Sequence, residues 1–253
     1  MKLTLLIIAF LSTSALAHQL QSVTQHIDLH RQNQTGWQQD ILGKMTTSRK
    51  WEVGVQGTYL ERFGFYENRG GAFALYHPSD ALTLEAKMLV GGENQILPRL
   101  QSSLSAYFGL INGVTPFASY KDTHYSVTRL HLMSFGIEIE KITNIVIIPL
   151  AMFGKATFEA PAETRDIHSY GMKLAYYREK FYSLFIFGYK GVEASQGIVG
   201  KSNFLIDTAS GGLGGSYHFI PQFKTELILD HTDYKQLKNQ FLTTTLNLVW
   251  DFE

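Results

Sequence analysis

The chain has 253 residues, and its 22 Lys and Arg against 22 Asp and Glu give a formal net charge of zero, which lends no support to a nucleic-acid partner. It contains no Cys, which excludes a disulfide framework and every metal or catalytic site built on thiolates. Hydrophobic residues make up 45% of the chain, yet the mean hydropathy is only −0.06, so apolar residues must be finely interleaved with polar ones.

Residues 1–17 have the composition of a secretory signal peptide. Lys2 is followed by an apolar run over residues 3–11 and then by small residues that end in Ala15-Leu16-Ala17. The apolar run is shorter than the ~20 residues that a spanning helix requires. We therefore expect export, cleavage and a mature chain that starts at His18.

Residues 18–49 are polar and rich in Gln, and they precede the first clearly alternating segment. We expect a periplasmic extension or plug here, with an added strand around residues 22–30 as the alternative. The three histidines of this segment, His18, His26 and His30, would bind a metal only if the fold brought them together, so no metal site is predicted.

From residue 50 onward, apolar and polar side chains alternate with the period of a strand. In residues 82–90, for example, Leu84, Met88 and Val90 oppose Glu85 and Lys87, and a strand places these two sets on opposite faces. We predict about twelve strands, at 50–62, 70–77, 81–90, 99–110, 114–124, 129–141, 145–158, 166–178, 180–191, 205–219, 222–234 and 240–252.

The connections between these strands alternate in length. Short turns such as "PSD", "ING", "TN" and "PQ" follow the even-numbered segments, and longer stretches such as "GGENQILP" and "VEASQGIVGKSNF" follow most odd-numbered ones. Short turns at one end and long loops at the other are typical of an outer-membrane barrel. The sequence therefore predicts an all-β, closed antiparallel up-and-down transmembrane β-barrel over residues 50–253.

A soluble periplasmic β-sandwich or a lipocalin-like barrel would also show alternation. Twelve strands exceed what a sandwich of this length usually carries, and aromatic residues recur at strand ends, as in the girdles of membrane barrels. Trp51, Tyr76, Phe108, Trp250 and Phe252 are examples. We expect the last strand to close the barrel by pairing with the strand at 50–62, so that no backbone edge meets lipid.

Local stretches of the chain resemble the YaiO family of outer-membrane β-barrel proteins. The stretches are "WEVGVQGTYLERFG", "YSVTRLHLMSFGIEIE" and the closing "TLNLVWDF", and the similarity covers residues 51–252. The resemblance implies a barrel in the outer membrane, inserted by the barrel-assembly machinery, with a role sometimes linked to cell-surface polysaccharide. It implies no active site.

One group of residues suggests an enzyme. His124 and Ser126, followed by Glu138, match in spacing the His-x-Ser and downstream Glu of outer-membrane lipid A deacylases. In a hairpin, however, Glu138 would lie about ten residues along the next strand, roughly 30 Å away at ~3.3 Å per residue. We therefore treat the deacylase as an alternative hypothesis and expect the three side chains not to assemble.

Charged side chains of both signs are predicted to face the lumen. They are Glu52, Arg62, Glu85, Lys87, Glu138, Glu140, Lys173, Lys224, Glu226 and Asp230. A selective pore usually lines itself with one sign, whereas mixed charges often pair and fill the lumen. The glycines of "SGGLGGS", residues 210–216, would leave room on one wall, and they lack the strand-loop-helix context of a phosphate site, so no cofactor is expected.

The sequence leaves three functions open. The first is a non-enzymatic structural or surface-binding role, in which the loops at 91–98 and 192–204 engage a surface glycan. The second is a small passive channel, and the third is the deacylase-like hydrolase. In every case the expected surroundings are outer-membrane lipid and lipopolysaccharide.

Overall fold

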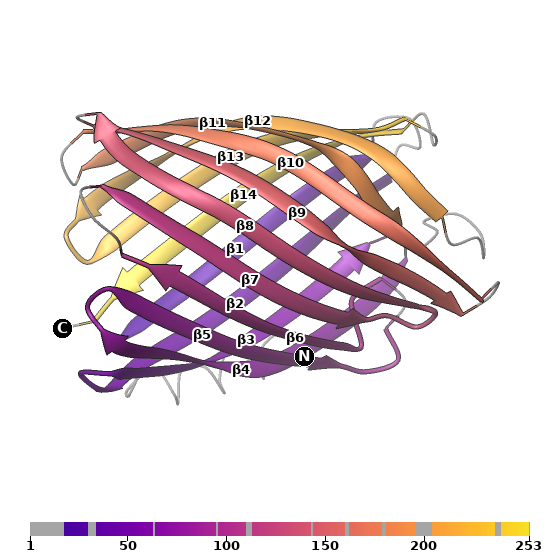
Figure 1. Ribbon diagram of the computed structural model, residues 1–253, viewed down its shortest axis with the longest axis horizontal. Helices are drawn as coiled ribbons and strands as arrows, with labels where there is room; N and C mark the ends of the chain where they lie inside the picture. The colour runs from indigo at the N-terminus through magenta and orange to yellow at the C-terminus, as the bar shows by residue number, and fades with distance from the viewer. Residues whose placement is uncertain are drawn as a thin grey trace.

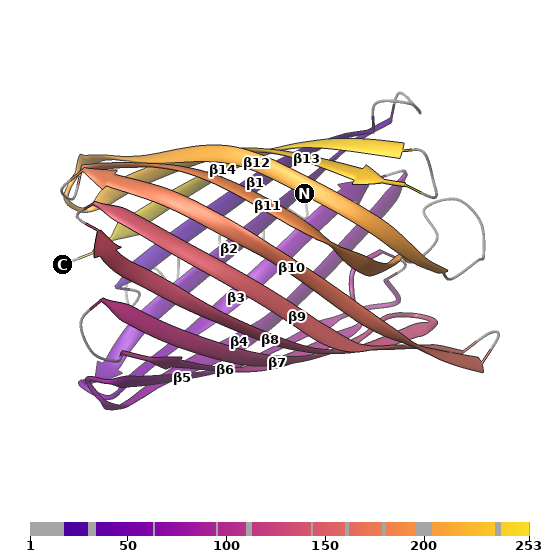
Figure 2. The same cartoon turned by 45° about the horizontal axis from the view of Figure 1, so that its top comes forward.

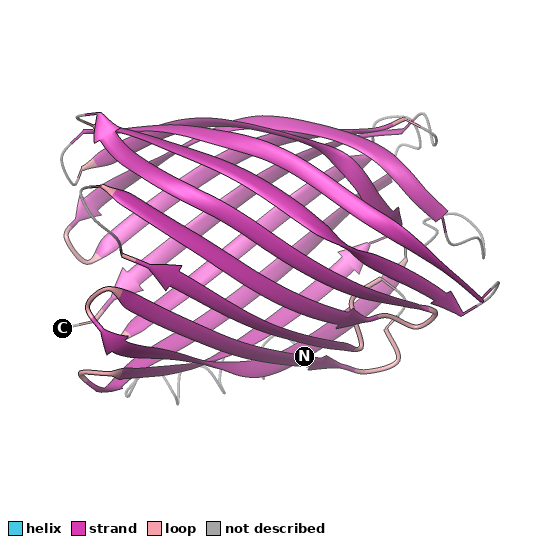
Figure 3. Cartoon of the chain, in the orientation of Figure 1, coloured by secondary structure: helices cyan, strands magenta, loops and turns pink. Residues whose placement is uncertain are grey.

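The computed structural model describes residues 18–29, 34–62, 64–94, 96–109, 113–142, 144–159, 162–178, 181–195, 204–235 and 239–252. Within these ranges every regular element is a strand (Figure 3). No helix among them is long and apolar enough to cross a membrane. The predicted signal peptide at residues 1–17 lies outside the described residues.

Fourteen antiparallel strands wind round one closed barrel, all tilted in the same sense to its axis (Figures 1 and 2). Their bounds are β1 Gln19–Leu29, β2 Gln34–Ser48, β3 Trp51–Arg62, β4 Phe65–Ser79, β5 Leu82–Gly91, β6 Leu100–Phe108, β7 Val114–His124, β8 Thr128–Ile142, β9 Ile145–Glu159, β10 Ala162–Arg178, β11 Tyr182–Ser195, β12 Phe204–Ile220, β13 Phe223–Tyr234 and β14 Asn239–Asp251. Each strand pairs with its sequence neighbours, and β14 pairs with β1 to close the ring. The predicted fold class is confirmed.

The strand count and the closing pair differ from prediction. The predicted periplasmic extension at residues 18–49 is wrong, because residues 19–29 and 34–48 form β1 and β2 of the wall, and these two strands raise the count from about twelve to fourteen. Strand β14 consequently pairs with β1, from Gln19 opposite Asp251 to Leu29 opposite Phe241, and not with the strand at 51–62. The closing seam carries a side-chain bond in which Gln19 Nε2 donates to Asp251 Oδ1 at 2.6 Å.

The sequence offered a strand around residues 22–30 only as the alternative, because the faces of β1 are not sorted by polarity. Directly opposite residues of an antiparallel pair share a face. Ser22 and Thr24 lie opposite Leu248 and Leu246, so these polar residues share the outer face of β14, whereas Val23 lies opposite Asn247 on the inner face. A strand with polar residues outside and an apolar one inside shows no amphipathic period.

The predicted asymmetry of the connections holds in part, because two connections at the end predicted to carry long loops, between β3 and β4 and between β9 and β10, are only two residues long. At the end of the barrel that carries the C-terminus, β4 and β5 are joined through residues 80–81, and β12 and β13 through residues 221–222. Two turns at this end contain a residue with positive φ, Asn144 at 67° and Gly113 at 76°, a conformation that Gly and Asn adopt at low cost. The other end carries the longer connections, including residues 92–99.

The outer wall is apolar and ends in aromatic rings. Leu104 and Met88 are 61% and 52% exposed, as expected for side chains that face lipid. At the end with the short turns, the Trp51 and Tyr76 rings stack with centroids 4.5 Å apart, and Trp250 packs between Phe223 and Phe252. This arrangement matches the aromatic girdle of a membrane barrel.

Candidate functional site

The connection between β5 and β6 folds into the barrel. Glu67 lies on the inner face of β4, two residues from Arg69, and its carboxylate accepts backbone N–H bonds from Ile96 at 2.9 Å and Leu97 at 2.6 Å. Glu67 is only 5% exposed and Leu97 only 6%. A buried carboxylate satisfied by two N–H groups fixes the connection against the inner wall.

A second set of contacts places the same connection over β5. Asn94 Nδ2 donates to the carbonyl oxygen of Asn68 at 2.9 Å, and the carbonyl oxygen of Pro98 lies 2.9 Å from where a Cβ on Gly91 would be. Leu89, two residues from Gly91 on the same strand face, is 1% exposed. We call residues 92–99 the inner loop. Residues 91–98, which the binding hypothesis assigned to a surface glycan, therefore contact the inner wall, and glycan binding stays a prediction. Of the second predicted loop, residues 196–203 lie outside the described ranges.

Three cationic side chains lie on the inner wall, each three or four residues from the end of its own strand on the side of the inner loop. They are Arg69 on β4, Lys87 on β5 and Lys121 on β7, and Ser103 of β6 lies in register between the two lysines. The charge of Lys121 interacts with those of Arg69 and Lys87. We call these three residues the cationic wall.

Arg69 is the member of the cationic wall that is held by neighbouring side chains. Its Nε donates to Thr58 Oγ1 at 3.3 Å and its Nη1 to Gln101 Oε1 at 3.1 Å. Asp40, whose charge interacts with that of Arg69, already accepts hydrogen bonds from Gln38 at 2.7 Å, from Gln56 at 3.3 Å and from Thr58. Hydrogen bonds from neutral side chains therefore occupy much of the acceptor capacity of the Asp40 carboxylate.

Lys87 and Lys121 form no ion pair and no side-chain hydrogen bond among the described residues. Next to them, Thr123 is 2% exposed and its Oγ1 has no hydrogen-bond partner within the described part of the chain. A buried hydroxyl without a partner is uncommon, because leaving it unpaired costs free energy. Around the cationic wall, hydrogen-bond donors therefore outnumber acceptors.

A row of aromatic rings lies on the other side of the lumen. Phe185, Phe187 and Tyr189 face inward from β11, with centroids 6.4 Å apart for the first pair and 5.6 Å for the second. Strand β11 lies seven strands from β4 in either direction round the closed ring, and so directly opposite it. We call these three rings the aromatic row.

Glycines of the adjacent strands let the aromatic row lie flat on the wall. A Cβ on Gly212 would lie 2.6 Å from Phe187 Cζ, and one on Gly214 would lie 2.5 Å from Phe185 Cζ. Gly171 of β10 meets the Tyr189 ring in the same way. The predicted room beside residues 210–216 exists, and the rings of the next strand occupy it, so they cover the wall and do not cross the lumen.

Carboxylates gather towards the end with the short turns. Tyr177, near the end of β10, interacts electrostatically with Glu138, Glu140 and Glu226. All three were predicted to face inward, as were Lys87 and Lys173 of the same lumen. Arg69 and Lys121 were not predicted to face inward. Lys121 could have been predicted, because it directly follows Tyr120, which faces outward, and side chains alternate along a strand.

The structure does not bring the three deacylase-like residues together. His124 pairs with Arg129 at one end of the β7–β8 hairpin, whereas Glu138 pairs with Thr115 near the other. Nine residues of strand separate Arg129 from Glu138, about 30 Å at ~3.3 Å per residue. His124 contacts Asp122 instead, with Nε2 3.2 Å from Oδ2, and Arg129 Nη2 binds the same carboxylate at 2.8 Å.

We therefore expect Ser126→Ala to leave lipid A unchanged. No imidazole is oriented by Glu138, so the serine has no relay that would activate it. Mass spectrometry of lipid A from cells that express the wild type, the variant or neither protein would measure this. Loss of an acyl chain with the wild type alone would restore the deacylase hypothesis.

No group of three or more potential metal ligands occurs among the described residues. His26 is in β1, His18 lies just before it, and His30 is outside the described ranges.

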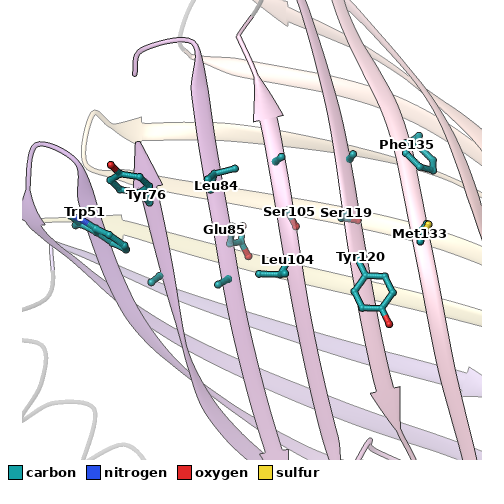
Figure 4. Close-up of a pocket in the computed structure, with 14 residues that line it drawn as sticks. Trp51, Tyr76, Leu84, Glu85, Leu104, Ser105, Ser119, Tyr120, Met133 and Phe135 are labelled. Carbon is teal, nitrogen blue, oxygen red and sulfur yellow. The ribbon is translucent and has the colours of Figure 1, made fainter. Parts of the chain in front are cut away.

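A shallow groove of about 600 Å³ marks the outer surface across β3 to β8 (Figure 4). Small side chains, among them Ala74, Ala86, Ala106 and Ala118, form its floor. Larger apolar side chains such as Leu104 and Phe135 surround it. Its position on the outward face makes it part of the surface that contacts lipid.

Comparison with known proteins supports the fold and not a family. No family model and no curated protein matches the chain. Among solved structures, the CymD monoaromatic hydrocarbon channel is 12% identical, with a TM-score of 0.69 over 94% of this chain and 89% of that one. A bacterial polysaccharide outer membrane secretin is 10% identical, with a TM-score of 0.57 over 93% and 98% of the two chains. OmpT of Vibrio cholerae is 9% identical, with a TM-score of 0.55 over 92% and 97%. The chain therefore has the fold of outer-membrane β-barrels.

Proposed function

We propose that the protein is a passive channel of the bacterial outer membrane that admits small solutes. The observation that carries this proposal is the form of the lumen. The inner loop enters the barrel and narrows one mouth, while charged side chains line the wall below it. Barrels of eight strands fill with side chains and those of sixteen or more hold aqueous channels, so fourteen strands lie close to the open class.

The comparisons support the proposal at the level of the fold. The similar structure with a TM-score of 0.69 is described as a channel, and it is matched over most of both chains. Outer-membrane location follows from the same fold together with the predicted signal peptide at residues 1–17, removal of which would leave His18 as the first residue. Lipopolysaccharide, outer-membrane lipid and the barrel-assembly machinery are then the partners that we propose.

The proposal predicts discrete conductance steps when the purified protein is added to a planar bilayer. The barrel should also migrate faster unheated than boiled on a denaturing gel, because its closed ladder of backbone bonds resists detergent. A protein that shows this gel shift but no conductance would be a folded barrel without an open lumen, and the channel would be rejected.

Replacing Glu67 with Ala should raise the single-channel conductance. The variant removes the acceptor that holds the Ile96 and Leu97 N–H groups, so the inner loop loses its attachment to β4. The matched control is Glu61→Ala, whose carboxylate bonds Trp37 Nε1 at 3.0 Å on another part of the wall and should leave conductance unchanged. Equal conductance in wild type and Glu67→Ala would show that the inner loop does not limit flow.

A structural or surface-binding role is the second candidate, because one exposed hairpin favours it. The strands β9 and β10 are among the longest, and their paired ends at residues 157–166 include the exposed residues Glu159, Glu163 and Arg165 (Figure 1). The likeness to a polysaccharide secretin fits a link with surface polysaccharide, which the YaiO resemblance also predicts. Negligible conductance, with altered surface polysaccharide on deletion of the gene, would favour this role.

A further inference from the structure

We infer that the lumen holds a binding site for small carboxylate anions at Arg69, Lys87 and Lys121. The inference rests on the proposed channel function, because it names the solute class that such a channel would favour. It concerns the cationic wall, whose three side chains lie on the inner faces of β4, β5 and β7.

The two lysines of the cationic wall form no ion pair within the described ranges. Like charges held close together on one wall repel, and an ammonium group that is half-buried gains from a nearby anion. Asp40 and Glu85 interact electrostatically with Lys87 but lie beyond ion-pair distance of it, and Asp40 already accepts hydrogen bonds from Gln38, Gln56 and Thr58. A carboxylate bound between the two lysines would give them a direct partner.

Hydrogen-bond donors around the lysines complete an oxyanion site. Among the described residues, no bond uses Nη2 of Arg69, whose Nε and Nη1 fix the guanidinium plane. Thr123 Oγ1, buried and without a partner, lies two residues from Lys121 on the same strand face. An arginine with a fixed plane, two ammonium groups and a hydroxyl are donors that suit a carboxylate.

Reversal potentials in a potassium benzoate gradient across a planar bilayer test the anionic part. The wild type should favour benzoate over potassium, and Lys87→Gln with Lys121→Gln should lower the permeability ratio on the order of three- to tenfold. Lys87→Arg with Lys121→Arg should restore it. The matched control is Lys224→Gln, which removes a lumenal lysine already 3.5 Å from Glu226 and should leave the ratio unchanged.

Equilibrium titration of the folded protein with benzoate and with acetate separates the site from the channel. We expect both carboxylates to bind the wild type, and Lys87→Gln with Lys121→Gln to lose the binding of both. The heat-dependent gel shift identifies variants that fold.

Four outcomes distinguish the proposals. Conductance with a benzoate preference that the double variant loses supports both the site and the channel. Conductance without that preference, or with equal ratios in all variants, overturns the site and leaves the channel. Benzoate binding that the double variant loses, without conductance, supports the site and overturns the channel. Neither binding nor conductance overturns both.

Discussion

Deletion of residues 18–48 is expected to abolish the folded barrel. The deletion removes β1 and β2, so that β14 and β3 each lose a full ladder of backbone partners. In lipid each unpaired backbone group costs several kcal/mol, because no water replaces the lost bond. The ends at β3 and β14 would have to pair with each other in a smaller barrel, although their side chains suit other neighbours.

The heat-dependent gel shift after refolding into detergent measures this outcome. The full mature chain should show a fast unheated band and the truncated chain none. As a control, a short Gly-Ser insertion after residue 31, in the connection between β1 and β2, should keep the fast band, because connections tolerate insertions better than strands. A truncated chain that still shows the shift would mean that these residues are a dispensable extension, as the sequence alone suggested.

Replacing Leu104 with Arg should lower the free energy of unfolding by about 2–4 kcal/mol, the cost of Arg near the middle of the lipid-facing wall. Leu104 is 61% exposed on the outer face, next to the alanines of the outer groove. The guanidinium would displace lipid contacts and find no counter-charge there. Met88→Arg, at a side chain that is 52% exposed on the neighbouring strand, should behave in the same way.

Urea titration of tryptophan fluorescence in lipid vesicles would give these free energies. The matched control is Ser105→Arg, one residue along the same strand but facing the lumen opposite Glu85, where the new charge gains a partner. It should cost much less than Leu104→Arg. Similar values at both positions would show that the two faces of β6 have been assigned the wrong way round.

Most of the wall could be predicted from the sequence because its determinants are local. Wherever an outer face meets lipid and an inner face meets polar groups, side chains alternate, as in residues 82–90, and the strand and both its faces follow from that pattern. The same logic placed Lys87, Glu138 and Glu226 inside. The separation of His124 from Glu138 also followed from strand geometry alone.

The inner loop and the cationic wall depend on contacts between residues far apart in the chain. Glu67 is an ordinary charged residue in the sequence, and only the fold shows that it accepts the N–H groups of Ile96 and Leu97. Arg69, Lys87 and Lys121 lie on three different strands, and their proximity depends on the register of β4 to β7. No single segment of the sequence determines the register between these strands or the direction in which the inner loop folds.

The sequence by itself determined the all-β class, the antiparallel up-and-down order, the short turns at one end and the side on which most residues of β3 to β14 face, because each is set by neighbouring residues. Only the tertiary structure decided that the ring has fourteen strands, that β14 closes on β1, and that residues 92–99 turn inward. The physical reason is that closing a barrel satisfies the backbone of its two edges whatever their side chains are. Ser22 and Thr24 can therefore lie on an outer face that their polarity does not predict, because the hydrogen-bond ladders to β2 and β14 hold β1 in the wall.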